Sequence, residues 1–253
     1  MPDVLAPGAF LGSCTVDPRV FELRPDYRAM LVVVDGLDPS APSTAADDLI
    51  ARAETHARDL LAASAVEDLP HIAAWRDAYR GFGAKPQRTR NSLEALTRRA
   101  DTGLPRLNAL TDAYNAISVL HQIPLGGEDF HAYAGPARLS RASGDEPFDT
   151  ASGGEPAIEY PEPGEVVWRD DVGVTCRRWN WRQGRRTALT DHTTAALFIL
   201  DVLAPISDSA VNVAADELLG VLVRLGGDVT FSRRMISAAE PETFNSTVEE
   251  LCP

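Results

Sequence analysis

Cysteine is scarce in this 253-residue chain: Cys14, Cys176 and Cys252 are its only three, and no two stand in C-x-x-C spacing. This pattern argues against a disulfide framework and against a structural zinc site. No apolar run approaches the roughly 18 residues that a membrane-spanning helix needs. The N-terminus also lacks the basic flank and apolar core of a signal peptide. We therefore expect a cytoplasmic protein with no membrane partner, no metal and no cofactor.

The residue patterns of several common catalytic sites are also missing. No serine lies in a G-x-S-x-G elbow, and no cysteine has a histidine partner at a recognisable spacing. The five histidines never form H-E-x-x-H or another tight ligand pair. These absences argue against nucleophilic and metal catalysis. They leave amides, carboxylates, hydroxyls and indoles, which suit a pocket that recognises a small zwitterion and places a water molecule.

Positive charge is in deficit overall, because the formal net charge is -13. A nucleic-acid binder usually presents a basic face, and the sign here is wrong for the chain as a whole. The segment 75–106 reverses it, with eight basic against three acidic side chains and a local charge of +5, and a second arginine cluster lies at 177–186. The candidate contacts with RNA are Arg80, Lys85, Arg88, Arg90, Arg98 and Arg99. The alternative is that these cations form ion pairs with the acidic surplus.

The order of predicted elements indicates one globular α+β unit. Residues 30–34 are typical of a buried strand, and residues 43–63 predict an alanine-rich helix. A second helix ends near Arg80, before two glycines and a proline, and a third begins near Asn91, a capping residue with Glu94 three positions on. From residue 124 to residue 190, glycine, proline and short β-prone runs predict strands and loops, with a glycine-rich acidic turn at their start.

The segment from Leu107 to His121 predicts an amphipathic helix. Its apolar residues recur at three- and four-residue spacing, so one face should be buried. A polar stripe lies beside this face and is typical of a solvated surface; it consists of Thr111, Asn115, Ser118 and Gln122. Asn115 in particular could face a pocket or bond to neighbouring backbone.

The C-terminal third contains one carboxylate in a notable position. Residues 195–200 are apolar, so Asp201 should emerge at the end of a strand or short helix. A further helix is expected over 211–225, ending at Gly226-Gly227, and residues 235–253 have weak periodicity and several acids.

Ordered motifs along the chain resemble the B3/B4 domain of the phenylalanyl-tRNA synthetase beta subunit, and more closely free-standing B3/4 domain proteins. They are R-x-x-Y-x-x-F-G from Arg76, N-S-x-E-A-L-x-R-R from Asn91, L-P-x-x-N-x-L-x-D-x-Y-N-x-x-S from Leu104, P-G-E-V-V from Pro163 and C-R-R-W-N-W-R from Cys176. The likeness implies an α+β fold with helices packed on β-sheets. It covers roughly residues 29–226, between an N-terminal segment (1–28) and a C-terminal tail (227–253).

The resemblance also implies a function. The synthetase domain hydrolyses tyrosine wrongly esterified to phenylalanine tRNA, so a free-standing relative would be a deacylase acting in trans on a mischarged aminoacyl-tRNA. Its partners would be the aminoacylated 3′ end of tRNA and a small amino-acid moiety, not DNA, and it would not be a complete synthetase. Oriented donors would activate the ester carbonyl while water attacks.

Carried over position by position, the resemblance assigns three catalytic residues: Asn115, Glu146 and Asp201. Asp201 would bind the substrate's ammonium or phenol hydroxyl, and Glu146 is either a pocket carboxylate or a turn residue. The substrate-binding residues would be Trp179, Asn180, Trp181 and Thr194.

Three departures from the family pattern weigh on the mechanism. Asp201 is one methylene shorter than the family's glutamate, and indoles stand where the synthetase has glycines, which implies a smaller pocket or a stacking wall. Gly126 replaces the editing histidine, for which His131 or His121 could substitute in space. The alternatives to a deacylase are therefore a non-catalytic module that binds a tRNA end or an amino acid, and a structural relic whose pocket is filled by Trp179 and Trp181.

Overall fold

The structure is a computed structural model that describes residues 6–239. Its helices are α1 (Pro7–Ser13), α2 (Pro18–Leu23), α3 (Asp47–Ala63), α4 (Pro70–Gly81), α5 (Ser92–Thr97), α6 (Ala109–His121) and α7 (Asp208–Leu222). Its strands are β1 (Thr15–Val16), β2 (Arg28–Leu37), β3 (Leu125–Asp129), β4 (Arg138–Arg141), β5 (Phe148–Ser152), β6 (Glu155–Glu159), β7 (Val166–Arg169), β8 (Val174–Arg177), β9 (Arg182–Gln183), β10 (Ala195–Val202) and β11 (Gly226–Ser237). The α+β class expected from the sequence is confirmed. None of the described helices has an apolar stretch of the length that a bilayer crossing requires.

A four-stranded antiparallel sheet lies at the centre, with the strand order β11-β2-β10-β3. Both faces are buried, which explains why β2 and β10 are almost continuously apolar. Along β2, Met30 and Val32 point into one core, whereas Leu31 and Val33 point into a second core on the other face. The predicted strand at 30–34 is therefore confirmed, and it extends to residue 37.

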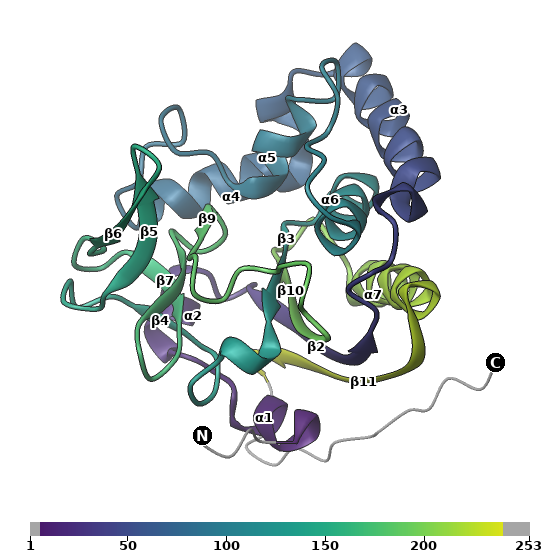
Figure 1. The fold of residues 1–253 in the computed structure, drawn as a ribbon. Helices are drawn as coiled ribbons and strands as arrows, with labels where there is room; N and C mark the ends of the chain where they lie inside the picture. Colours follow the sequence, from purple (N-terminus) through teal and green to yellow (C-terminus); the bar gives the residue numbers. More distant parts are fainter. Residues whose placement is uncertain (1–5, 240–253) are drawn as a thin grey trace.

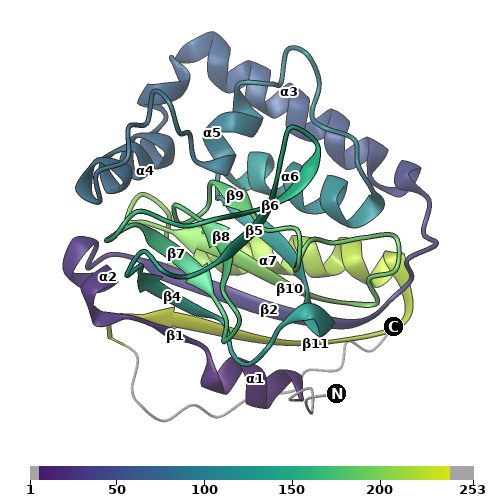
Figure 2. The ribbon, with the colours of Figure 1, turned by 60° about the vertical axis from the view of Figure 1, so that its left-hand side comes forward.

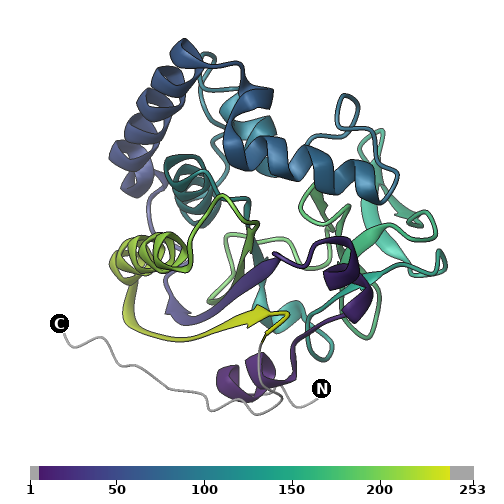
Figure 3. The same ribbon diagram turned by 180° about the vertical axis from the view of Figure 1, so that it is seen from behind.

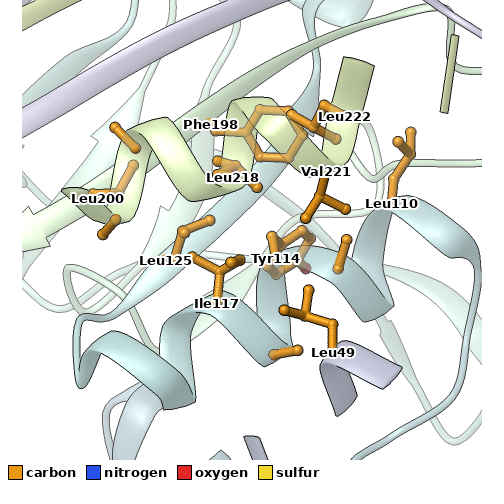
Figure 4. Close-up of a cluster of buried hydrophobic side chains, with 14 of the residues drawn as sticks. Leu49, Leu110, Tyr114, Ile117, Leu125, Phe198, Leu200, Leu218, Val221 and Leu222 are labelled. Atoms are coloured by element: carbon orange, nitrogen blue, oxygen red, sulfur yellow. The ribbon is translucent and has the colours of Figure 1, made fainter. Parts of the chain in front are cut away.

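Helices α3, α6 and α7 cover one face of this sheet (Figure 1). Figure 4 shows part of this core, in which Leu49 of α3, Ile117 of α6, Leu218 of α7 and Phe198 of β10 belong to one cluster. Each of these side chains is at most 7% exposed. The layer fixes α6 against β3 and β10, and so determines where the polar stripe of α6 lies.

The remaining strands form a second sheet that packs on the opposite face of the first (Figure 2). Its order is β1-β4-β7-β8-β5-β6, with β9 paired to β8. Helix α4, seen at the top of Figure 3, adds Trp75 and Tyr79 to the core between the sheets. The two sheets thus share one apolar interior, and the polar residues within it define the site described below.

Both ends of the described chain extend beyond the boundaries expected from the sequence. Strand β11 (Gly226–Ser237) lies almost wholly in the segment assigned to a C-terminal tail (227–253), and it pairs with β2 along most of its length. Within the expected N-terminal segment, Phe10 and Leu11 of α1 are buried in the core between the sheets. Residues 240–253, including Cys252, lie outside the described residues.

The helix predicted over 107–121 differs from the expectation in two respects. It begins at Ala109, where the Asn108 side chain accepts a hydrogen bond from the Thr111 amide, and Leu107 is 71% exposed before it. The polar stripe is not solvated, because α6 is enclosed by other helices and the sheet. Asn115 and Ser118 are both buried.

Two expectations for the strand-rich half also need correction. The glycine-rich acidic segment after Pro124 is not a turn but strand β3, whose glycines pair with Phe198 and Ile199 of β10. Among the β-prone runs, residues 172–181 form a strand over only Val174–Arg177, and the residues after it form a turn.

Candidate functional site

A cavity of about 100 Å³ lies between the two sheets and α6. Its polar walls include Asn115 on α6, Glu128 on β3, Asp201 on β10 and Asn180 in the turn after β8, and Gly126 of β3 lies beside them. Five of the catalytic and substrate-binding residues predicted from the sequence therefore lie around one cavity, although 86 positions separate the first from the last: Asn115, Trp179, Asn180, Trp181 and Asp201.

Asp201 lies on the face of β10 that otherwise carries Leu197 and Ile199, so its carboxylate enters the core between the sheets. The Tyr27 hydroxyl donates to its Oδ1 at 2.5 Å, and the Asn180 carboxamide donates to its Oδ2 at 3.4 Å. Burial raises the pKa of Asp201 to about 7, although both hydrogen bonds lower it. The carboxyl can therefore change its charge near neutral pH.

Glu128 is a second buried carboxyl at the cavity, and it was not among the residues predicted from the sequence. The Tyr133 hydroxyl donates to its Oε2, whereas its Oε1 has no hydrogen-bond partner among the described residues. Burial raises the pKa of Glu128 to about 7 as well. In the sequence, the charged side chain after two glycines is a signal that could have pointed to Glu128. Its burial, however, follows only from the pairing of β3 with β10.

The turn between β8 and β9 brings Asn180 to Asp201. Arg178 and Trp179 have φ angles of 48° and 67°. This is a left-handed backbone conformation that residues other than glycine rarely adopt. The backbone N–H of Asn180 donates to the Arg178 carbonyl at 2.8 Å, which closes a three-residue turn around Trp179. The Tyr79 hydroxyl donates to the side-chain Oδ1 of Asn180 at 2.9 Å, and this orients the side-chain Nδ2 of Asn180 toward Asp201.

The two indoles of this turn have different positions. Trp179 is fully buried and makes edge contacts with Tyr27 and Trp75, so most of its ring belongs to the core. Trp181 is partly exposed, and the guanidinium groups of Arg178 and Arg182 lie over its ring at 4.5 and 4.8 Å. Both indoles line the cavity, and space remains between them and Asp201.

An amide side chain occupies the space beside Gly126 in the cavity. A Cβ at Gly126 would lie 2.9 Å from Gln183 Nε2, so the Gln183 carboxamide fills the space that a side chain there would take. Gln183 Nε2 donates to the Gly127 carbonyl at 3.0 Å. Asn115 makes no side-chain hydrogen bond with any described residue, so its carboxamide is available to a ligand.

Neither histidine proposed as a substitute reaches the cavity. His121 pairs with Glu217 of α7 at 2.7 Å, and His131 lies beyond the end of β3. Cys176 does line the cavity, but burial raises the pKa of its thiol well above the usual value. A protonated thiol is a poor nucleophile. The described lining therefore suits hydrolysis by water rather than covalent catalysis.

Two of the predicted site residues lie away from the cavity. Glu146 accepts hydrogen bonds at 3.0 Å from the Ser143 and Gly144 amides, so it stabilises a turn, which was the other interpretation of its position. Thr194 is exposed just before β10, at the opposite end of that strand from Asp201.

The basic segment divides into paired and unpaired cations. Arg98 and Arg90 lie 3.0 and 3.6 Å from the buried Glu94, and Arg80 pairs with Asp77. The ion-pair alternative thus describes these three. By contrast, Lys85, Arg88 and Arg99 are exposed and have no charged partner among the described residues.

Two of the unpaired cations lie on the loop 82–91, which borders the cavity. In this loop the Thr89 hydroxyl accepts a hydrogen bond from Arg178, and the Ser92 amide that follows donates to the Asn180 carbonyl at 3.0 Å. Ser92 itself lines the cavity. Lys85 and Arg88 are therefore held on a segment that is attached to the turn carrying Asn180.

Comparison with known proteins gives a family and a structural likeness. The family model of the B3/4 domain matches residues 74–219. Among solved structures, the chain is similar to an N-terminal fragment of the phenylalanyl-tRNA synthetase beta subunit from Pyrococcus horikoshii, with 12% identity and a TM-score of 0.45. That similarity covers 88% of this chain and 53% of the fragment, so the chain spans about half of the fragment's length. A search of curated proteins gives no match.

Proposed function

The chain belongs to the B3/4 domain family, and on this basis we propose that it binds the aminoacylated 3′ end of a tRNA and hydrolyses a mischarged amino-acid ester in trans. The observation that carries the proposal is the convergence of Asp201, Asn180 and Asn115 on one cavity beside a loop with unpaired cations. The resemblance to the synthetase editing domain assigns a role to each of these residues.

The cavity suits the aminoacyl group of such a substrate. In its ionised form Asp201 would bind the α-ammonium, with Tyr27 and Asn180 holding its carboxylate in place. Asn115, on the adjacent wall, has a free amide donor that could bind the ester carbonyl. Donors positioned at the oxygen where charge develops stabilise the transition state of ester hydrolysis. At about 100 Å³, the cavity favours a small amino acid.

The charged surface suits the nucleic-acid part. Lys85 and Arg88 could contact phosphates next to the terminal adenosine, and the exposed edge of Trp181 offers a ring on which a base can stack. The rest of the chain is strongly acidic, which would repel a polyanion from other faces. We therefore expect weak, oriented binding that depends on salt.

The non-catalytic binding module remains the second candidate, because a specific observation favours it. Gly126 and the Gln183 amide stand at the histidine position of the family, and no histidine lines the cavity among the described residues. Such a module would bind the same ligand by the same contacts but leave the ester intact.

The test is deacylation of a panel of labelled mischarged tRNAs by the purified protein and its Asp201→Asn and Asn115→Ala variants. The proposal expects turnover of at least one ester, falling roughly 100-fold or more in each variant, which corresponds to about 3 kcal/mol of lost hydrogen bonding. Asp216→Asn, which alters an exposed carboxylate on α7, is the matched control and should leave the rate unchanged. No turnover with any ester, together with ligand binding that Asp201→Asn weakens, would establish the binding module.

The RNA contacts need a separate measurement. Replacing Lys85 and Arg88 by glutamate should weaken binding to tRNA and reduce the slope of log K against log salt by about two, one for each lost phosphate contact. Arg224→Glu, a charge reversal at the end of α7, serves as the matched control. Equal losses in the two variants would refute a specific role for the loop.

A further inference from the structure

The two carboxyls of the cavity differ in how their oxygens are engaged. Asp201 has a donor on each oxygen, from Tyr27 and from Asn180. Glu128 has a donor on Oε2 alone, from Tyr133, while Oε1 is buried without a partner among the described residues. Glu128 is only 1% exposed and lines the cavity. Of the two carboxyls, Glu128 is therefore the one with an oxygen that can accept a hydrogen bond from a ligand or a water molecule in the cavity.

A buried carboxylate oxygen without a donor is unfavourable, so it strongly attracts a group that can donate a hydrogen bond. A water molecule meets that need in a polar cavity with other partners nearby. Glu128 lies on the same face of β3 as Gly126, two residues along the strand, because these residues pair with Leu197 and Ile199 of β10. Water bound to Oε1 would thus lie next to the space beside Gly126 and Gln183.

We propose that Glu128 is the general base of the deacylation, an inference that rests on the function proposed above. Water held by Oε1 attacks the ester carbonyl carbon, and its proton passes to Glu128. The bond between the carbonyl carbon and the ribose oxygen then breaks, and that oxygen takes the proton back from Glu128. The products are the free amino acid and a tRNA with an intact terminal ribose, and Glu128 is regenerated as a carboxylate.

The charges around Glu128 are consistent with this role. Arg186 lowers the pKa of Glu128, and Asp170 raises it, but these two groups bind each other at 2.8 Å and largely offset. The Tyr133 and Thr175 hydroxyls lower the pKa of Glu128 as well. The other titratable groups near Glu128 are Tyr114, Cys176 and Asp201. Burial dominates and raises the pKa to about 7, near the optimum for a base that works at neutral pH.

This assignment separates the roles of the two carboxyls. Asp201, held on both oxygens, positions the substrate's ammonium, whereas Glu128 moves the proton. It also accounts for chemistry without a histidine at residue 126, because a carboxyl of raised pKa can serve as base at neutral pH.

The test compares the wild type with Glu128→Gln, which keeps the shape of the side chain but cannot accept a proton. Two readouts are taken: deacylation of the ester that the wild type turns over, and binding of a hydrolysis-resistant amide analogue of the aminoacylated terminal adenosine. We expect kcat to fall roughly 100-fold or more, with the Kd of the analogue changed less than about threefold. The wild-type rate should rise with pH to a plateau above about pH 7. This rise should be smaller in the variant, in which Asp201 is the carboxyl that still titrates near pH 7.

Tyr133→Phe provides a second variant in case Glu128→Gln folds poorly. Removing the hydroxyl that lowers the pKa of Glu128 should move the midpoint of the pH profile upward. An active wild type with Glu128→Gln within about threefold of its rate would overturn the inference and leave the proposed function standing. Equal losses of turnover and analogue binding would also overturn it, since Glu128 would then be a binding group. A wild type inactive on every ester would overturn both.

Discussion

Replacing Asp201 by asparagine should stabilise the protein at alkaline pH relative to acidic pH. The Asp201 pKa is raised from 3.8 to about 7 in the folded protein by burial. Because the folded state holds the proton more tightly than the unfolded state, the free energy of unfolding decreases as pH rises from about 4 to about 7 and then levels off. Asparagine resembles the protonated acid and does not titrate, so its contribution is independent of pH.

The size of the effect follows from the shift. About three pKa units at about 1.4 kcal/mol each correspond to about 4 kcal/mol of stability that the wild type loses between pH 4 and pH 8. The asparagine variant escapes this loss, although its amide faces the Asn180 amide and adds a penalty that does not vary with pH. Glu128 titrates in both proteins, so its own contribution cancels to first order.

Urea unfolding of both proteins at about pH 4, 6 and 8 measures the difference directly. We expect the stability of Asp201→Asn minus that of the wild type to increase by about 4 kcal/mol from the lowest to the highest pH. Asp216→Asn, at a carboxylate that is 63% exposed, should show a small and nearly constant difference. A constant difference for Asp201→Asn would refute the reasoning, because it would mean that the carboxyl titrates normally in the folded protein.

Two further predictions concern stability. In the urea unfolding assay, Gly36→Ala should destabilise the protein by more than about 2 kcal/mol, because φ is +83° and the new Cβ would lie 2.4 Å from the Asp228 carbonyl oxygen. Its control is Gly83→Ala, where φ is +88° but the space around the new Cβ is open. This variant should lose only about 1 kcal/mol. Glu94→Gln should cost about 3–5 kcal/mol by the same assay, because it leaves the largely buried Arg76 without the carboxylate that lies 2.8 Å away. A loss below about 1 kcal/mol would show that Arg76 finds solvent instead.

Local patterns predicted the elements whose signals lie within a few residues. The helix start at Asn91 is confirmed, since its side chain accepts a hydrogen bond from the Glu94 amide at 2.8 Å. The end of α4 at Gly81 and the buried strand β2 are confirmed for the same reason. The interpretation of α6 as half-solvated was wrong, because periodicity shows which face is more apolar and not whether other helices cover the polar face.

The site was only partly predictable, because its residues meet through long-range pairing. Asp201 and Asn115 were identified from motifs, and the structure brings both to the cavity. Glu128 was missed, since its burial requires the register that sets it opposite Leu197. The cations show the same limit: the sequence gives a basic segment, but only the fold determines that Arg98 pairs with Glu94 while Lys85 has no charged partner among the described residues.

Features that destabilise the fold gather at the cavity, and this supports its importance independently of any family likeness. Two consecutive residues, Arg178 and Trp179, hold left-handed conformations that cost on the order of 1–3 kcal/mol each. Two carboxyls, Asp201 and Glu128, are buried at a further cost that their raised pKa values express. The strained turn is what carries the Asn180 amide to within 3.4 Å of Asp201. A relic that kept only its fold would have no need of this strain, whereas a site that must orient an amide against a carboxylate does. The presence of strained backbone and buried carboxyls at one cavity therefore favours a functional site over a structural remnant.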